Sequence, residues 1–169
     1  MDAARAEKLV RRRTRRLFGL LPGVDPCRAD GRTLYWPVDL AAATAVVKPP
    51  LRKERQVRIP VARDAVTGRL GTVDMRLADP AEVDPGEEAL LLEPDHLDGR
   101  EWWEFARNQV VLRYRPSRIT GLALVERRRV HVPYRVVRCG PDTWLVDSMF
   151  GRAVDARSLG VEHQRTLGL

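Results

Sequence analysis

Apolar residues return every three or four positions at the start of the chain, and this spacing predicts an amphipathic helix over residues 2–18. Asp2 stands where a side chain caps a first helical turn, and Leu21-Pro22-Gly23 ends the pattern. Arginines occupy the other faces, so the predicted helix carries a basic surface. Its apolar stripe consists of Ala3, Ala6, Val10, Leu17 and Leu21.

A second helix is expected from Asp98 onward, because apolar side chains again share one face. After residue 111 apolar residues alternate with arginines, which predicts a switch from helix to extended chain. The residues expected on the buried face are Trp102 or Trp103, Ala106 and Val110.

Four segments in the first half have other local patterns. Strict alternation over residues 57–62 predicts a half-buried strand, and residues 70–77 are expected to return beside it. Residues 33–38 are expected to form an edge strand, since Pro37 has no N–H for a central ladder. The alanine-rich residues 39–47 are expected to form a short helix that ends before two prolines.

The second half is expected to consist mainly of strands after its helix. Residues 119–125 form one predicted strand, and residues 90–92 a shorter one. A hairpin across Gly140-Pro141-Asp142 is expected to join residues 130–137 to residues 144–146. The tail from Ala156 is expected to be a turn of helix or coil.

These elements predict one α+β domain over residues 1–169, with two main helices and a mostly antiparallel sheet of about six strands. An acidic loop rich in proline and glycine, residues 79–88, joins candidate halves 1–78 and 89–169.

The two halves contain a similar pair of short motifs. Leu34-Tyr-Trp-Pro37-Val is echoed by Val130-His-Val-Pro133-Tyr, with one proline in each. Asp64 and Gly68, followed by arginine, are echoed by Asp147 and Gly151, again followed by arginine. Each aspartate is expected to cap a turn that its glycine closes with a positive φ. Duplication of a helix-plus-hairpin unit and ordinary hairpin chemistry both explain the echo.

The Asp-Ala-Val-Thr-Gly turn and the Val-Pro-Tyr … Leu-Val-Asp hairpin resemble hairpins of PepSY-type and other cystatin-like small α+β domains. The second turn departs from the pattern, with Phe150 where threonine would stand. The resemblance implies a helix packed across a curved antiparallel sheet. It also implies a binding or inhibitory module without catalytic residues.

Charge is unevenly distributed along the chain. The net charge is +7 with a pI of about 10.2, and all but Lys8, Lys48 and Lys53 of the 30 basic residues are arginine. That ratio is typical of a GC-rich bacterium or its phage, so part of the basicity reflects coding bias. Residues 74–104 carry a net −9 and residues 105–138 a net +8, so internal pairing and docking on a charged partner are both open.

The two cysteines, Cys27 and Cys139, stand apart from each other and from histidines. Lone thiols fit a reducing cytoplasm, whereas a Cys27–Cys139 bridge is the alternative. No stretch approaches the ~18 apolar residues of a membrane span. We therefore expect a cytoplasmic protein without a membrane span.

Nothing in the chain predicts a catalytic site or a cofactor. Cys139, His131 and Asp147 suggest a nucleophilic triad, but about eight residues of strand, or roughly 26 Å, would separate Cys139 from His131. Asp147 is instead expected to pair across the hairpin with Arg135. His96 is expected to be a solvated loop residue and not a metal ligand.

The sequence therefore predicts a non-catalytic accessory or adaptor protein that docks on another protein or complex subunit. We expect Trp36 to pack in the core, and Trp103 as well, yet the tryptophan pair would anchor an interface if one ring is exposed. The alternative is a nucleic-acid-binding protein that uses the arginine-rich helix 5–16 and the basic stretch 105–138. The candidate contact residues are Arg11, Arg12, Arg15, Arg16, Phe18, Trp102 and Trp103.

Overall fold

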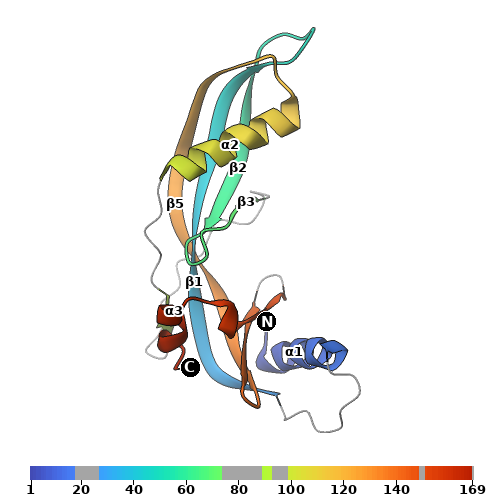
Figure 1. Ribbon diagram of the computed structural model, residues 1–169, viewed down its shortest axis with the longest axis vertical. Helices are drawn as coiled ribbons and strands as arrows, with labels where there is room; N and C mark the ends of the chain where they lie inside the picture. The colour runs from blue at the N-terminus through green and yellow to red at the C-terminus, as the bar shows by residue number, and fades with distance from the viewer. Residues whose placement is uncertain (18–26, 74–88, 93–98, 149–150, 169) are drawn as a thin grey trace. The chain divides into compact units, whose positions relative to one another are not determined.

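The computed structural model describes residues 1–17, 27–73, 89–92, 99–148 and 151–168. The predicted class is confirmed, since helices accompany a mainly antiparallel sheet (Figure 1). The helices are α1 (Ala3–Leu17), α2 (Gly99–Tyr114) and α3 (Val161–Thr166), with a 3-10 turn at Ala156–Ser158. The strands are β1 (Cys27–Lys48), β2 (Arg55–Asp64), β3 (Leu70–Thr72), β4 (Leu90–Leu91), β5 (Arg118–Cys139), β6 (Asp142–Asp147) and β7 (Ala153–Asp155).

The strands follow the order β3-β2-β1-β5-β6-β7, and β4 pairs with β1 in parallel. The chain divides into two compact units. Unit 1 contains Met1–Trp36, Val83–Glu93 and His131–Leu169, and unit 2 contains Pro37–Glu82 and Pro94–Val130. These units do not coincide with the predicted halves 1–78 and 89–169, because β1 and β5 each pass from one unit into the other.

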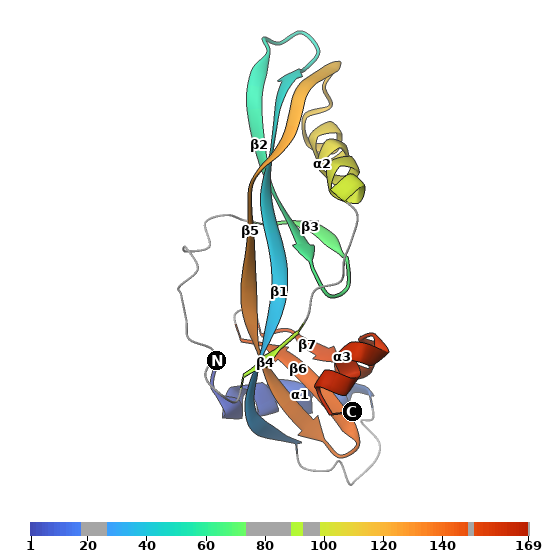
Figure 2. The same ribbon diagram turned by 90° about the vertical axis from the view of Figure 1, so that its left-hand side faces the viewer.

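In unit 2, α2 lies across one face of strands β5, β1 and β2, as two perpendicular views show (Figures 1 and 2). Trp102, Ala106 and Val110 form its buried stripe, so that part of the prediction is confirmed. The sheet supplies the other half of this core with alternate residues of β1 and β2, which are Ala41, Ala43, Ala45, Val47, Val57, Ile59 and Val61.

The predicted helix over residues 39–47 is wrong, because this segment is the second part of β1. Alanine has a high helix propensity, but β2 and β5 both pair with this stretch, and those contacts override the local preference. The small side chains of Ala41, Ala43 and Ala45 also leave room for the Trp102 ring of α2.

The expectation of an edge strand at Pro37 is wrong as well, since β1 lies between β2 and β5. Proline is tolerated because β4 pairs at Leu34 and Tyr35, and the β2 ladder begins only at Val38. The ring therefore falls between two partners on that side of β1. The Pro37 carbonyl accepts a 3.1 Å hydrogen bond from the Ala65 N–H.

Helix α2 does not become extended at residue 111, as the alternation predicted, but continues to Tyr114. The Arg55 guanidinium lies 5.1 Å from the centre of the Tyr114 ring and holds the last turn against β2. Arg115 then takes a φ of +44° and ends the helix. The two strands predicted at 119–125 and 130–137 are one continuous strand, β5.

In unit 1, α1 packs through Ala6 and Val10 onto Val137, Trp144 and Val146 of the β5–β6 hairpin. Asp2 caps the helix as predicted, because its Oδ1 accepts a 2.8 Å hydrogen bond from the Arg5 N–H. At the far end of the chain the 3-10 turn and α3 follow β7. There the pKa of Asp155 is lowered, mainly by a side-chain hydrogen bond from Arg157.

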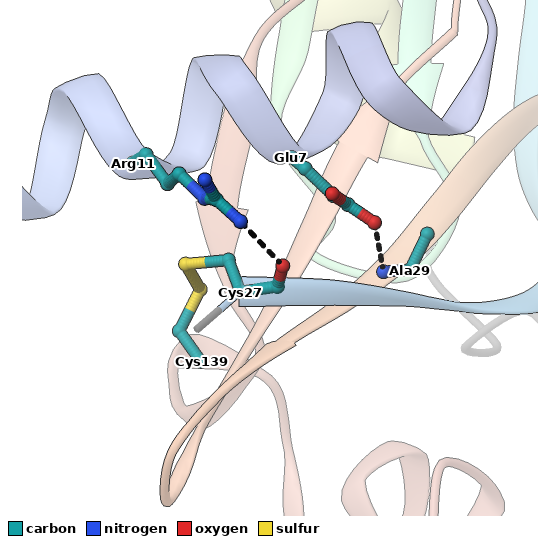
Figure 3. Close-up of a disulfide and its surroundings, with 5 residues drawn as sticks. All are labelled: Glu7, Arg11, Cys27, Ala29 and Cys139. Atoms are coloured by element: carbon teal, nitrogen blue, oxygen red, sulfur yellow. Dashed lines mark hydrogen bonds between the residues drawn. A yellow bond between two sulfur atoms is a disulfide. The ribbon is translucent and has the colours of Figure 1, made fainter. Parts of the chain in front are cut away.

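Cys27 and Cys139 form a disulfide, so the interpretation as lone thiols is wrong (Figure 3). Their Cα atoms lie 4.1 Å apart, where the first residue of β1 meets the last residue of β5. Beside the bridge, the Glu7 carboxylate accepts a 3.0 Å hydrogen bond from the Ala29 N–H, and Arg11 donates to the Cys27 carbonyl at 3.4 Å (Figure 3). We call Glu7 and Arg11 the α1 latch, since they hold the helix to the backbone of β1.

The turn at Asp64 forms as the sequence predicts. The Asp64 N–H donates to the Arg69 carbonyl at 2.9 Å, and the Gly68 N–H donates to the Asp64 carbonyl at 2.9 Å. The Asp64 carboxylate also accepts from Val66 N–H at 3.0 Å. Gly68 has the expected positive φ, +71°.

The turn at Asp147 repeats this pattern. The Asp147 N–H donates to the Arg152 carbonyl at 2.8 Å, and the Gly151 N–H donates to the Asp147 carbonyl at 3.0 Å. Gly151 has a φ of +67°. The Pro133 carbonyl accepts from the Ser148 N–H at 2.9 Å, as the Pro37 carbonyl does from Ala65.

Removing the disulfide with Cys27→Ser/Cys139→Ser is expected to lower the free energy of unfolding of unit 1. The bridge joins residues 112 positions apart, and a loop of that size predicts a loss of about 4–5 kcal/mol. Urea unfolding of the wild-type chain with and without reductant measures this loss. Reductant should not affect the double-serine variant, and equal midpoints for the oxidised and reduced wild-type chain would contradict the expectation.

Candidate functional site

A pocket of about 390 Å³ opens in unit 2 between α2 and the start of β5. One wall comes from α2 and the other from the connection into β5 and its first residues. The described residues of this lining include two arginines and no carboxylate, so the pocket is suited to negative charge. The lining residues are Trp103, Arg107, Val111, Pro116, Ser117, Arg118, Ile119, Thr120, Gly121 and Leu122.

Trp102 and Trp103 lie in different environments although they are neighbours. Successive helical residues point about 100° apart, so one ring can enter the core while the next stays outside. Trp102 is 6% exposed and Trp103 is 43% exposed. The expectation that Trp103 packs in the core is therefore wrong, and the condition for an interface anchor, one exposed ring, is met.

Trp103 belongs to an exposed stripe on α2 that also contains Arg107 and Val111. These residues are four positions apart, so their side chains lie on one flank of the helix, beside the pocket. Val111 is 41% exposed. The spacing of these three residues is present in the sequence, but the apolar pattern of the helix marks only its buried stripe. The pocket residues on β5 carry no pattern of their own.

The β5 wall is fixed by local bonds and by its own core contacts. The Ser117 N–H and its hydroxyl both donate to the Lys48 carbonyl, each at 2.8 Å. Ile119 and Leu122 pack against the unit 2 core. Gly121 has a φ of +62°, which lets the strand bulge between these two contacts.

Ion pairs lie on both faces of this sheet. Asp39 lies between Arg129, at 2.6 Å, and Arg63, at 4.0 Å. The hydrogen bond from Arg129 to Asp39 is the main reason that the pKa of Arg129 is raised. Arg58 pairs with Glu126 on the other face, because Arg58 and Arg63 lie on opposite sides of β2. Internal pairing thus absorbs part of the basic charge of residues 105–138, which weakens the case for a continuous nucleic-acid surface.

The predicted contact residues of α1 are only partly described. Arg11 and Arg12 are exposed, and Arg11 belongs to the α1 latch. The side chains of Arg15 and Arg16, and the whole of Phe18, lie outside the described residues. The structure therefore does not bring the α1 arginines and Trp103 together as one described site.

The candidate triad has no place in the structure. Cys139 is bonded to Cys27, and a disulfide sulfur is no thiol nucleophile. Asp147 stands opposite Tyr134 and not Arg135, which donates to Thr33 at 3.1 Å instead. His96 lies outside the described residues. Among the side chains that the structure describes, no three His, Cys, Asp or Glu residues gather as a metal site.

Comparison with known proteins gives no match to a family model, a curated protein or a solved structure. The likeness of the two turns to PepSY-type and cystatin-like hairpins stays a prediction. Within the described residues, none of the helices is long and apolar enough to cross a membrane.

Proposed function

We propose that this protein is a non-catalytic adaptor that binds another protein through the pocket between α2 and β5. The exposed Trp103 ring at the edge of this pocket carries the proposal. Tryptophan and arginine are the residues that most often contribute strongly to binding, and Trp103 stands one helical turn from Arg107. The ring is 43% exposed and lies beside the exposed Arg107 and Val111, so an apolar and cationic surface is available to a partner at this pocket.

The charges of the lining indicate what kind of partner fits. Arg118 already pairs with Glu54 at 2.8 Å, whereas Arg107 is exposed on α2. A partner that places a carboxylate beside Arg107 and an apolar side chain on Trp103 would complement both features. The exposed Arg11 and Arg12 of α1 would add a second, salt-sensitive contact.

We further infer that the chain contains two copies of one helix-and-strands unit. In each copy a helix precedes a long strand, a second strand pairs with it, and a third strand follows an Asp-x-x-x-Gly-Arg turn. Three backbone hydrogen bonds of the two turns correspond, from those at Pro37 and Asp64 to those at Pro133 and Asp147. The extra residues of the first copy lengthen its hairpin, which joins β1 to β2 through residues 49–54.

The cores support the same correspondence. Ala6 and Val10 of α1 match Trp102 and Ala106 of α2, each pair being buried at the same distance from its helix start. The sheet side compensates for this difference in size, because Trp144 of unit 1 corresponds to Val61 of unit 2. Each of these two cores thus contains one tryptophan. The sheet supplies it in unit 1, as Trp144, and the helix supplies it in unit 2, as Trp102.

Backbone features inside the long strands match too. Gly31 in β1 and Glu126 in β5 both have positive φ values, +83° and +55°. Gly31 precedes Pro37 by six residues and Glu126 precedes Pro133 by seven, so β5 has one extra residue between these points. Four residues before the positive-φ positions stand Cys27 and Leu122, which both contact their own core. Cys139 and Ala43 each follow the shared proline by six residues. The disulfide of unit 1 therefore has its counterpart in the pair Ala43 and Leu122.

The disulfide also bears on where the protein works. The expectation of a cytoplasmic protein rested in part on two lone thiols, and neither cysteine is a thiol here. Structural disulfides persist in oxidising compartments and are rare in the cytosol. We therefore favour an oxidising compartment over the cytoplasm.

The binding proposal predicts that Trp103→Ala abolishes capture of a protein partner without loss of stability. A tagged chain and its variants would be incubated with extract of the native host, with and without nuclease, and bound proteins identified by mass spectrometry. Leu112→Ala is the matched control, because Leu112 is a 70% exposed residue of α2 outside the pocket. Partner capture that survives Trp103→Ala, or that depends on nucleic acid, would contradict the proposal.

The duplication predicts that Ala43→Cys/Leu122→Cys forms a second disulfide on oxidation. Both residues contact the unit 2 core, as the native cysteines contact that of unit 1. Ala43→Cys/Ala123→Cys is the control, since Ala123 is exposed on the other face of the strand. Peptide mapping by mass spectrometry identifies the disulfides that form and measures their yield. An equal yield from both variants, or none from the first, would refute the correspondence.

A further inference from the structure

In unit 1 the chain covers the outer edge of β1 with its own groups. The α1 latch bonds the Ala29 N–H and the Cys27 carbonyl. Farther along, Leu34 and Tyr35 pair with the two residues of β4, and the Leu92 N–H donates to the Tyr35 carbonyl at 3.3 Å. Covering an edge in this way removes unpaired donors and acceptors from a strand border.

In unit 2 the corresponding edge belongs to the first part of β5. Its neighbours are β1 on one side and β6 on the other, and β6 pairs only with Tyr134 to Cys139. In the part of the chain that the structure describes, no strand lies beside Arg118–Val130 on that outer side. On this edge Leu122 and Leu124 correspond to Cys27 and Ala29, whose backbone groups the α1 latch bonds in unit 1.

The latch itself has been replaced in α2. Counting from the two helix starts, Trp103 stands where α1 has Glu7, and Arg107 stands where α1 has Arg11. An indole has one N–H donor and no acceptor, so Trp103 cannot accept the strand N–H that Glu7 accepts. Among the hydrogen bonds of the described residues, none joins the Trp103 or Arg107 side chain to the backbone of β5.

This edge has a bulge at Gly121 but lacks two other features that protect a strand border. Natural edges carry charges or prolines that prevent pairing with another chain. The stretch from Thr120 to Val125 contains neither, and Arg118 and Arg127 flank it. Leu122 and Leu124 bury one side of this stretch on the unit 2 core, which holds its backbone extended.

We propose that the outer edge of β5 pairs with an extended segment of the partner protein, so that the segment becomes an added strand. This proposal deepens the proposed function and rests on it. The added strand would take the place that the α1 latch fills in unit 1, with Leu122 and Leu124 as the counterparts of Cys27 and Ala29. Main-chain hydrogen bonds supply affinity in such pairing, and pockets for alternate side chains supply specificity.

The chemistry of the segment follows from its surroundings. Trp103 and Val111 offer an apolar wall, and Arg107 and Arg127 offer positive charge at the sides. The chain's own covering strand has this composition, because Leu90 and Leu91 stand between glutamates at 87, 88 and 93. The partner segment is therefore short, apolar in its middle and acidic at its ends.

A synthetic peptide with the sequence of residues 86–94 tests this pairing, since it has the required composition. It would be titrated into isotope-labelled full-length protein while backbone amide shifts are followed by NMR. We expect saturable shifts centred on Leu122, Ala123 and Leu124. A Leu91→Pro peptide loses an N–H, and a Glu87→Lys/Glu88→Lys peptide loses its charge complement, so each should bind about tenfold more weakly.

Two variants of Trp103 separate pairing at the edge from simple contact with the ring. Trp103→Gln supplies the acceptor that Glu7 supplies in α1, and Trp103→Met does not. Trp103→Gln should therefore slow hydrogen exchange of the Leu124 amide in the protein without peptide. It should also lower the affinity for the peptide more than Trp103→Met does. Equal effects of the two variants would overturn the assignment of the edge.

The remaining outcomes also decide the matter. Shifts confined to Leu34 and Tyr35 would mean that the peptide displaces β4, and no shift at millimolar peptide would mean that it pairs nowhere. Either result overturns edge pairing while capture of a partner through Trp103 still stands. Shifts at Leu122–Leu124 without any captured partner would instead leave edge pairing intact and remove the proposed function.

Discussion

The pairing of β1 with β5 is the interaction on which the rest of the structure depends. Each strand is 22 residues long and supplies its first part to one compact unit and its second part to the other. Each core is consequently completed by residues far apart in the sequence, and neither continuous half of the chain contains a whole core. The Cys27–Cys139 bridge fixes this pairing covalently at one end, in unit 1.

Local patterns predicted those elements whose burial they encode directly. The alternation of Val57, Ile59 and Val61 became β2, and the chemistry of Asp64 and Gly68 became its turn. The alanine-rich segment failed because its state is set by two neighbouring strands, which a local window does not contain. The edge strand predicted from Pro37 was wrong for a related reason. A proline is disfavoured in a central strand, but Pro37 falls between the stretches of β1 that pair with β4 and with β2, where no N–H is needed.

The site was harder to predict than the fold. The exposure of Trp103 follows from the burial of Trp102, but the sequence alone left open which ring faces the core. The second wall of the pocket belongs to β5, whose position beside α2 is a tertiary fact. The sequence left the disulfide undecided for the same reason. Its cysteines are 112 residues apart, and only the pairing of the strand ends brings them together.

Differences between the two units explain how one of them could acquire a binding edge. In unit 1 the helix carries Glu7, which bonds the edge of β1, whereas in unit 2 the helix carries Trp103 and no described strand lies beside the outer edge of Arg118–Val130. A single exchange of an acceptor for an apolar ring both opens the strand and provides an anchor beside it. On this account the two units share a framework and differ in whether the chain covers its own edge.

Amide hydrogen exchange on the unliganded protein tests this central claim most directly. The account predicts slow exchange at Ala29, whose N–H is bonded to Glu7, and fast exchange at its counterpart Leu124. Comparable protection at the two amides would show that the edge of β5 is already covered, and would contradict the account.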